Sequence, residues 1–247
     1  MAGHSKWANT KHRKGRQDAK KGKVFTKLAR AITVAAREGG PEPDYNANLA
    51  NAIEKAKSEN MPNDNIERAI KKGTSSEDMD HYEAIVYEGY GANGTAFIVS
   101  CLTDNKNRTA ADIRHYFSKN DGNLGSTNCV SYLFDRVGII AIEKDKDIDE
   151  DELMMYALEN GAEDVRIEEE LYEILISPEN YQEVLGNFKS GPYKLLGSEV
   201  TLIPKTMVAI SEKETYNKIK KLIETLEDND DVQEIYHNVK LDEIEES

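Results

Sequence analysis

The amino-acid sequence predicts an α+β protein of three domains, a small helical bundle and two ferredoxin-like α/β sandwiches, the last inserted in the second. Three observations lead to this prediction. Apolar residues recur at helical spacing early in the chain, they alternate from His81 onward, and a β-α-β-β-α-β succession follows. The expected domain bounds are 1–79 for a basic tail plus the helical domain, 80–134 with 204–241 for the discontinuous domain, and 135–203 for the insertion.

Three short helices are expected in the first domain. The first is indicated by an i, i+3, i+4 pattern of apolar residues at Phe25, Leu28, Ala29, Ile32, Ala35 and Ala36. Glycine and proline at 39–41 end it, a second stripe ends before Met61, and a third helix runs from about Asn63 to Gly73. Each apolar face is too narrow for an isolated helix, so the three should pack together. Residues 1–22 have no apolar period and are expected to form a tail that is extended or becomes ordered on a partner.

The remainder is expected to form two α/β domains. The discontinuous domain is predicted from strands at 82–87 and 95–100, helices at 107–119 and 212–226, and a strand at 232–237. The inserted domain is predicted from strands at 137–143, 163–168, 171–176 and 198–203 with helices at 150–160 and 179–189. The last helix and strand of the chain have no sheet of their own, which is why we assign them to the domain that begins near His81.

Charge is strongly segregated along the chain. The whole sequence has a formal net charge of −14, which argues against a polyanionic partner. Residues 1–30, however, hold ten basic side chains and one acidic side chain, a net of +9. Such asymmetry indicates one end that faces a polyanion and a remainder that repels itself and stays soluble.

The basic segment is the strongest functional signal, because Lys and Arg neutralise phosphates and release counterions. Trp7, the only tryptophan, lies in this segment, where it either stacks on an unpaired base or packs on the protein's own helices. A second basic set lies on the helix expected at 107–119, where Arg108 falls near His115 and Lys119 on one face. The candidate nucleic-acid-binding residues are Lys6, Trp7, Lys11, His12, Arg13, Lys14, Arg16, Lys20, Lys21, Lys23 and Arg108.

Catalytic, metal and cofactor sites are not expected. Residues 89–94 match G-x-G-x-x-G, but a strand rather than a helix follows, which indicates a hairpin loop. The acidic run 145–151 lacks the glycine of a calcium loop and reads as the start of a helix. Cys101 and Cys129 have no close-spaced partner, so free thiols are expected. No apolar stretch approaches the roughly 20 residues of a membrane span, and a cytoplasmic protein is expected.

Several sequence motifs resemble the YebC/PmpR family. The opening Met1-Ala2-Gly3-His4-Ser5-Lys6-Trp7-Ala8-Asn9 is the most specific of them. The similarity continues almost to the end of the chain, at 11–14, 17–20, 60–62, 65–70, 87–91, 103–105, 107–109, 122–125 and 227–233. The resemblance implies one helical and two α/β domains and a cytoplasmic, DNA-binding transcriptional regulator. Relatives are described instead as ribosome-associated factors that help translation through proline runs.

Two nucleic-acid functions therefore remain open at this point, and both are non-enzymatic. The first is transcriptional control by DNA binding, which the family label favours. The second is an RNA-directed translation factor on the ribosome that relieves stalling at proline-rich sequences. An enzyme acting on nucleic acid or nucleotides and a scaffold that binds acidic proteins are the other classes considered. The expected partner is DNA or ribosomal RNA, with no membrane and no small-molecule substrate.

Overall fold

The computed structural model describes residues 17–75 and 82–240, with side chains from residue 22 onward. Helices and mainly antiparallel sheets confirm the α+β class. The chain forms two compact units. The first comprises the described residues up to Thr74 together with Arg136–Leu202, and the second comprises Ser75–Asp135 together with the residues from Ile203 on. The separation of the first unit into two domains, as predicted above, stays a prediction.

The helical part of the first unit consists of α2 (Gln17–Gly39), a short turn of helix η2 (Pro43–Tyr45), α3 (Ala47–Ser58) and α4 (Asn63–Thr74). Leu28 and Ile32 of α2 pack with Leu49 of α3 and Ile66 of α4 in one apolar core. Helices as short as α3 and α4, with 12 residues each, gain most of their stability from such packing.

The expectation that residues 1–22 form an extended tail is wrong for 17–22. These residues are the first turn and a half of α2. Their sequence has no apolar period, but it contains residues of high helix propensity such as Gln, Ala and Lys, which favour a helix. Apolar periodicity detects only the part of a helix that packs on something. Residues 1–16 lie outside the described part of the chain.

A single buried amide fixes the corner between α2 and α3. Asn46 is 6% exposed, and its side-chain oxygen accepts a hydrogen bond from the backbone N–H of Leu49, which caps α3. Its Nδ2 donates to the carbonyl oxygens of Ala35 at 2.8 Å and Gly40 at 2.9 Å. The cap therefore satisfies groups at the ends of two helices with one side chain.

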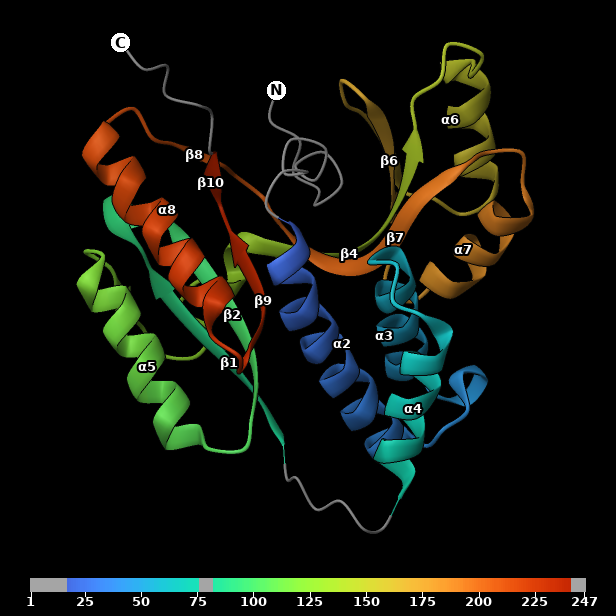
Figure 1. The fold of residues 1–247 in the computed structure, drawn as a ribbon. Coiled ribbons are helices and arrows are strands. Elements are labelled where there is room, and N and C mark those ends of the chain that lie inside the picture. The colour runs from blue at the N-terminus through green and yellow to red at the C-terminus, as the bar shows by residue number, and fades with distance from the viewer. Residues whose placement is uncertain (1–16, 76–81, 241–247) are drawn as a thin grey trace. The chain divides into compact units, whose positions relative to one another are not determined.

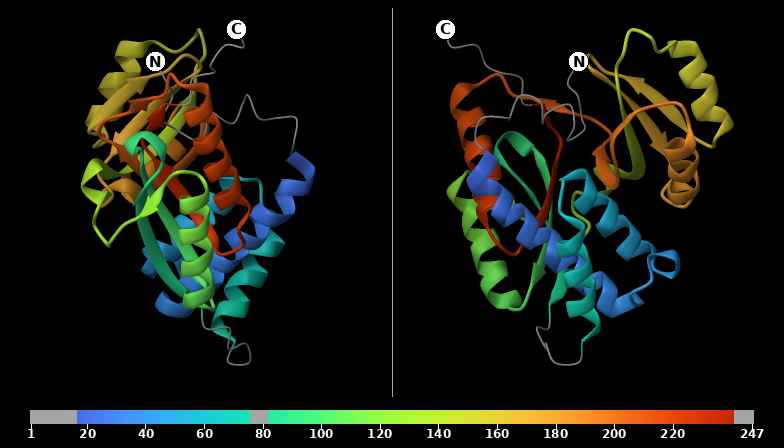
Figure 2. Two further views of the ribbon diagram at one scale, coloured as in Figure 1. Left: turned by 90° about the vertical axis from the view of Figure 1, so that its left-hand side faces the viewer. Right: turned by 45° about the vertical axis from the view of Figure 1, so that its right-hand side comes forward.

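The rest of the first unit is a four-stranded sheet with two helices on one face (Figures 1 and 2). Its elements are β4 (Phe134–Glu143), α6 (Glu150–Glu159), β5 (Asp164–Ile167), β6 (Leu171–Ile176), α7 (Tyr181–Ser190) and β7 (Leu195–Pro204). The spatial order β5-β6-β4-β7 is that of a ferredoxin-like sandwich. Ile140 and Tyr172 of the sheet pack with Leu153 of α6 and Phe188 of α7.

The second unit contains a four-stranded sheet of order β3-β1-β2-β9 and a two-stranded parallel sheet of β8 and β10. Its elements are β1 (Glu83–Tyr90), η3 (Ala92–Gly94), β2 (Ala96–Thr103), α5 (Lys106–Lys119), β3 (Asn123–Leu124), η4 (Ser131–Leu133), β8 (Val208–Ala209), α8 (Lys213–Asp228), β9 (Val232–His237) and β10 (Val239–Lys240). Helices α5 and α8 cover one face of the larger sheet (Figure 1).

The strand arrangement of this unit is ferredoxin-like, but its chain order is not. Every adjacent pair in the larger sheet is antiparallel, as in a ferredoxin-like sheet. The central hairpin β1–β2 comes first, however, so the elements follow as β-β-α-β-α-β. The strands β3, β8 and β10 were not expected, because two residues are too short to show an alternating pattern.

Candidate nucleic-acid interface

The structure describes only part of the basic set that the sequence singles out. Seven of its members lie outside the described residues, namely Lys6, Trp7, Lys11, His12, Arg13, Lys14 and Arg16. Lys20 and Lys21 lie in α2, but their side chains are not described. Lys23 is exposed on α2, and Arg108 is exposed on α5. The binding role of the tail therefore stays a prediction.

One face of α2 carries a row of cations that continues from the basic tail. Lys23, Lys27 and Arg30 are spaced by four and three residues, which places them on the same side of the helix at about 100° per residue. Leu28 and Ile32 lie on the opposite side, in the apolar core. The row ends where α2 becomes buried on all sides from residue 32 to 36.

The outward face of α4 adds two cations that were not among the predicted site residues. Arg68 and Lys71 are exposed and are separated by three residues. Within the described part of the chain, neither has an ion-pair partner among its neighbours. The signal was present in the sequence, since Ile66 and Ala69 define the buried face and leave these two side chains on the other. Lys71 and Lys72 also stand in the last turn, where the helix dipole favours positive charge.

Arg108 has carboxylate partners of its own. Its Nη2 lies 2.7 Å from Oδ1 of Asp104 and 2.9 Å from Oδ2 of Asp231. Thr103 and Thr109 donate hydrogen bonds to the same oxygen of Asp231. Burial alone would raise the pKa of Asp231, but these hydrogen bonds and the Arg108 charge lower it. Arg108 therefore ties α5 to the loop before β9, and its predicted contact with phosphate stays a prediction.

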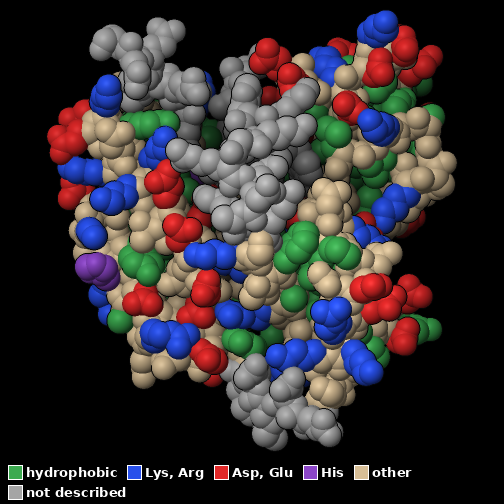
Figure 3. Space-filling model, viewed as in Figure 1, with side chains coloured by type: hydrophobic (Ala, Val, Ile, Leu, Met, Phe, Trp, Pro, Cys, Tyr) green, Lys and Arg blue, Asp and Glu red, His purple; other side chains and the backbone are tan. Residues whose placement is uncertain are grey.

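The other cations near Arg108 differ in their surroundings. Lys106 pairs with Glu83, whereas Arg114, His115 and Lys119 are exposed on α5. On the face seen in Figure 3, Lys and Arg side chains alternate with Asp and Glu. The folded part of the chain in that view has no extended field of one sign, so the concentration of positive charge at residues 1–30 stands out.

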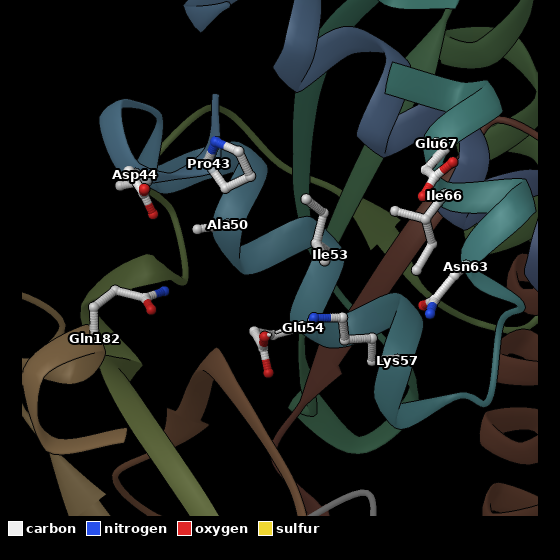
Figure 4. Close-up of a pocket in the computed structure, with 11 residues that line it drawn as sticks. Pro43, Asp44, Ala50, Ile53, Glu54, Lys57, Asn63, Ile66, Glu67 and Gln182 are labelled. Carbon is white, nitrogen blue, oxygen red and sulfur yellow. Dashed lines mark ion pairs between the residues drawn. The ribbon is translucent and has the colours of Figure 1, made fainter. Parts of the chain in front are cut away.

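A groove of about 580 Å³ lies beside α3 in the first unit (Figure 4). Asp44, Glu54 and Glu67 line it, with Lys57 as its cation, so it is unsuited to phosphate. Glu54 is held in ion pairs, at 3.6 Å from Lys57 and 2.8 Å from Lys189. No group of three His, Cys, Asp or Glu side chains that could hold a metal ion occurs among the residues the structure describes.

The remaining sequence motifs have structural roles. Gly89 and Tyr90 end β1, and residues 91–94 belong to the loop of the β1–β2 hairpin, with Asn93 at φ 58° and Gly94 at φ 70°, which confirms the hairpin interpretation. Asp149 in the acidic run caps α6 by accepting hydrogen bonds from the N–H groups of Asp151 and Glu152. Neither cysteine forms a disulfide, as expected; Cys101 is buried and Cys129 is half-buried. Among the described helices, none has the length and apolar character needed to cross a membrane.

Comparisons with known proteins cover nearly the whole chain. Residues 5–76 match the family model "TACO1/YebC protein N-terminal domain", and residues 82–239 match "TACO1/YebC second and third domain". A probable transcriptional regulatory protein of Bacillus licheniformis is 56% identical over 240 residues, which is 97% of this chain and 100% of that protein. One of Thermoanaerobacter pseudethanolicus is 53% identical, over 98% of each chain.

A solved structure shows the same fold. The crystal structure of a conserved hypothetical protein from Aquifex aeolicus has a TM-score of 0.83 and 45% sequence identity, over 98% of this chain and 100% of that one. Two family models together span both compact units, and relatives above 50% identity match end to end. The chain belongs to the TACO1/YebC family.

Proposed function

We propose that this protein is a nucleic-acid-binding regulator that binds DNA through its basic amino-terminal segment and controls transcription in the cytoplasm. The observation that carries the proposal is the segregation of charge, +9 within residues 1–30 of a chain whose total is −14. The cation row on α2 supports it, because Lys23, Lys27 and Arg30 extend the same charge onto a folded helix. The names of the relatives support a regulatory role.

The binding is electrostatic in this proposal. Lys and Arg neutralise phosphates and release condensed counterions, which gives affinity without sequence information. Contacts of this kind position the protein on the nucleic acid. Nothing in the chemistry of the segment calls for a reaction, and the protein acts as a binding factor rather than as an enzyme.

An RNA-directed translation factor on the ribosome is the second candidate. Recognition helices that read bases in the major groove use residues near their amino-terminal end. On α4 the outward residues at that end are the acids Asp64 and Glu67, which phosphates repel. This arrangement favours recognition of backbone and shape, the mode typical of structured RNA.

A salt titration tests the electrostatic mechanism. If about six phosphates are contacted, affinity for duplex DNA should fall on the order of a thousandfold between about 50 and 200 mM salt. Replacing Lys11, Arg13 and Lys14 by Ala should flatten this dependence. An affinity that does not change with salt would rule the mechanism out.

The choice between the two candidates needs a second measurement in the same buffer. Promoter DNA is titrated against random duplex of equal length, and co-sedimentation with ribosomes is followed at moderate salt. A preference for promoter DNA supports transcriptional control. Ribosome association without any preference among duplexes would exclude it in favour of the translation factor.

A further inference from the structure

A loop of the second unit is unusual for its lack of charge. Between Asp121 and Asp135 the sequence contains no Asp, Glu, Lys, Arg or His, in a chain in which charged residues make up 32%. The segment is nevertheless largely at the surface: Asn123 and Ser126–Asn128 are exposed. Surface loops that carry binding residues are typically held by a rigid scaffold.

One buried carboxylate holds this loop. Glu88 of β1 is 5% exposed, and it accepts hydrogen bonds from the backbone N–H groups of Asn128 at 2.8 Å, Val130 at 2.9 Å and Ser131 at 2.9 Å. Burial raises the pKa of Glu88, but the three backbone hydrogen bonds outweigh it and lower the pKa overall. The loop is therefore fixed by its main chain, which leaves its side chains available to a partner.

Further bonds fix the same segment to β1. The backbone N–H of Gly125 donates to the carbonyl oxygen of Glu88 at 2.8 Å. The Tyr90 hydroxyl donates to the carbonyl oxygen of Cys129 at 3.0 Å. Asn128 adopts φ 65°, a left-handed conformation that asparagine tolerates better than most residues. A backbone held this closely loses little conformational entropy when a ligand binds.

Tyr132 is the aromatic side chain that this loop exposes. It is 62% exposed and lies in η4, directly after the residues that Glu88 holds. The pKa of Tyr90 is raised, first by its interaction with the Tyr132 phenol. The backbone just before the ring is held by Glu88, while much of the ring faces solvent. An exposed aromatic ring on a backbone that is held in place is a suitable platform for stacking a flat ligand.

We propose that Tyr132 and the loop around it form a site for an unpaired nucleobase. The base stacks on the Tyr132 ring, while the exposed Ser126, Thr127 and Asn128 offer hydroxyl and amide groups to its edge. Bases have a flat π face and an uncharged edge of donors and acceptors. An uncharged loop therefore suits a base better than it suits a charged phosphate. This inference rests on the proposed nucleic-acid function and adds a contact that the basic tail does not supply.

The test compares single strands with duplex, using the full-length protein. Probes are a short oligouridylate, an oligodeoxythymidylate and a duplex of equal length, each titrated at several salt concentrations. Tyr132→Ala should weaken single-strand binding by about fivefold to a hundredfold, the range expected for one base–aromatic stack. Tyr132→Trp should restore it. Binding to duplex should be unchanged, because paired bases do not present their faces.

The salt dependence separates this contact from the tail. Stacking releases no counterions, so Tyr132→Ala should lower affinity by the same factor at each salt concentration and leave the slope intact. Tyr45→Ala is the matched control, since Tyr45 is 90% exposed in the first unit and has no comparable loop. The two single strands decide whether the base belongs to RNA or DNA.

Each outcome bears on the site or on the function. If the wild-type protein binds none of the three probes, the proposed function fails, and this inference with it. If the wild-type protein binds single strands and Tyr132→Ala binds them as tightly as Tyr45→Ala, the nucleobase site is wrong and the function stands. An equal loss on duplex and single strands would also overturn it, because the contact would then not be stacking.

Discussion

At the scale of single residues, the most consequential side chains are buried polar groups that the sequence does not distinguish from surface ones. Glu88 and Asp231 are two among 46 acidic residues. Their roles depend on hydrogen bonds to residues about forty to more than a hundred positions away. Sequence patterns report local periodicity, so they could identify the basic tail but not these carboxylates.

Glu88→Ala should destabilise the second unit by about 3 kcal/mol, because it leaves three backbone N–H groups without their acceptor. Urea unfolding measures the loss, and hydrogen exchange should quicken at Asn128, Val130 and Ser131. Glu83→Ala on the same strand is the control. Its carboxylate is 56% exposed and pairs with Lys106, so its removal should cost less than about 1 kcal/mol. Equal losses for the two variants would contradict the conclusion that Glu88 holds the loop.

His237 should make the free energy of unfolding decrease in mild acid. Burial lowers its pKa from 6.5 to about 4, and Nδ1 accepts a hydrogen bond from the N–H of Val239 at 3.3 Å. Between these two pH values the unfolded chain binds a proton that the folded chain does not. Its contribution to stability is therefore complete above about pH 6.5 and is lost as pH falls toward 4. Urea midpoints measured across this range should decline, and His237→Gln should remove part of the decline. An unchanged slope in the variant would show that other groups cause it.

At the scale of secondary-structure elements, the sequence predicted the long elements and missed those too short or too polar to show an apolar pattern. The strands predicted at 171–176 and 232–237 have those bounds in the structure. The start of α2 and the strands β3, β8 and β10 were not predicted, because an apolar pattern becomes visible only over several residues that pack on a core. The same limit explains why Arg68 and Lys71 were not chosen, although the buried face of α4 was recognised.

Replacing glycine by alanine should change stability in opposite directions at Gly73, where α4 packs on α2, and at Gly22 in α2. A Cβ at Gly73 would lie 2.3 Å from the carbonyl oxygen of Thr33, a backbone atom that cannot move aside easily. Gly73→Ala should therefore cost about 1–3 kcal/mol. A Cβ at Gly22 meets nothing within 4 Å, and the residue lies inside α2. Gly22→Ala should stabilise the helix by up to about 1 kcal/mol.

Thermal unfolding and helix content by circular dichroism measure both changes. A gain in helicity for Gly22→Ala also checks that α2 begins at Gln17, against the extended segment that the sequence suggested. If the variant loses stability, residues 17–22 are not a stable part of the helix. If Gly73→Ala is neutral, the two helices are not packed as closely as the structure has them.

At the scale of the whole molecule, the distribution of charge along the chain separates the proposed binding segment from the rest. Residues 73–247 carry 16 basic and 38 acidic side chains, a net of −22, while residues 1–72 carry a net of +8. A uniform charge of −14 would repel a phosphate chain, whereas this distribution leaves one segment of the sequence with a net positive charge that attracts it. In the proposed function this distribution orients the protein as it approaches the nucleic acid, because fields of opposite sign steer association.

This polarity predicts that equal charge changes have unequal effects. Arg68→Ala with Lys71→Ala removes two exposed cations from α4, in the basic part of the chain. The double change should lower the salt dependence of duplex binding by about two units of logarithmic slope if both contact phosphate. Lys220→Ala with Lys221→Ala removes two exposed cations from α8, in the acidic part, with the same change in net charge. That pair should leave the slope nearly unchanged and weaken binding only slightly.

Fluorescence anisotropy at several salt concentrations measures both slopes. An equal decrease of the slope in both double variants would mean that net charge alone governs binding. The cations of α4 would then make no specific contact with the nucleic acid.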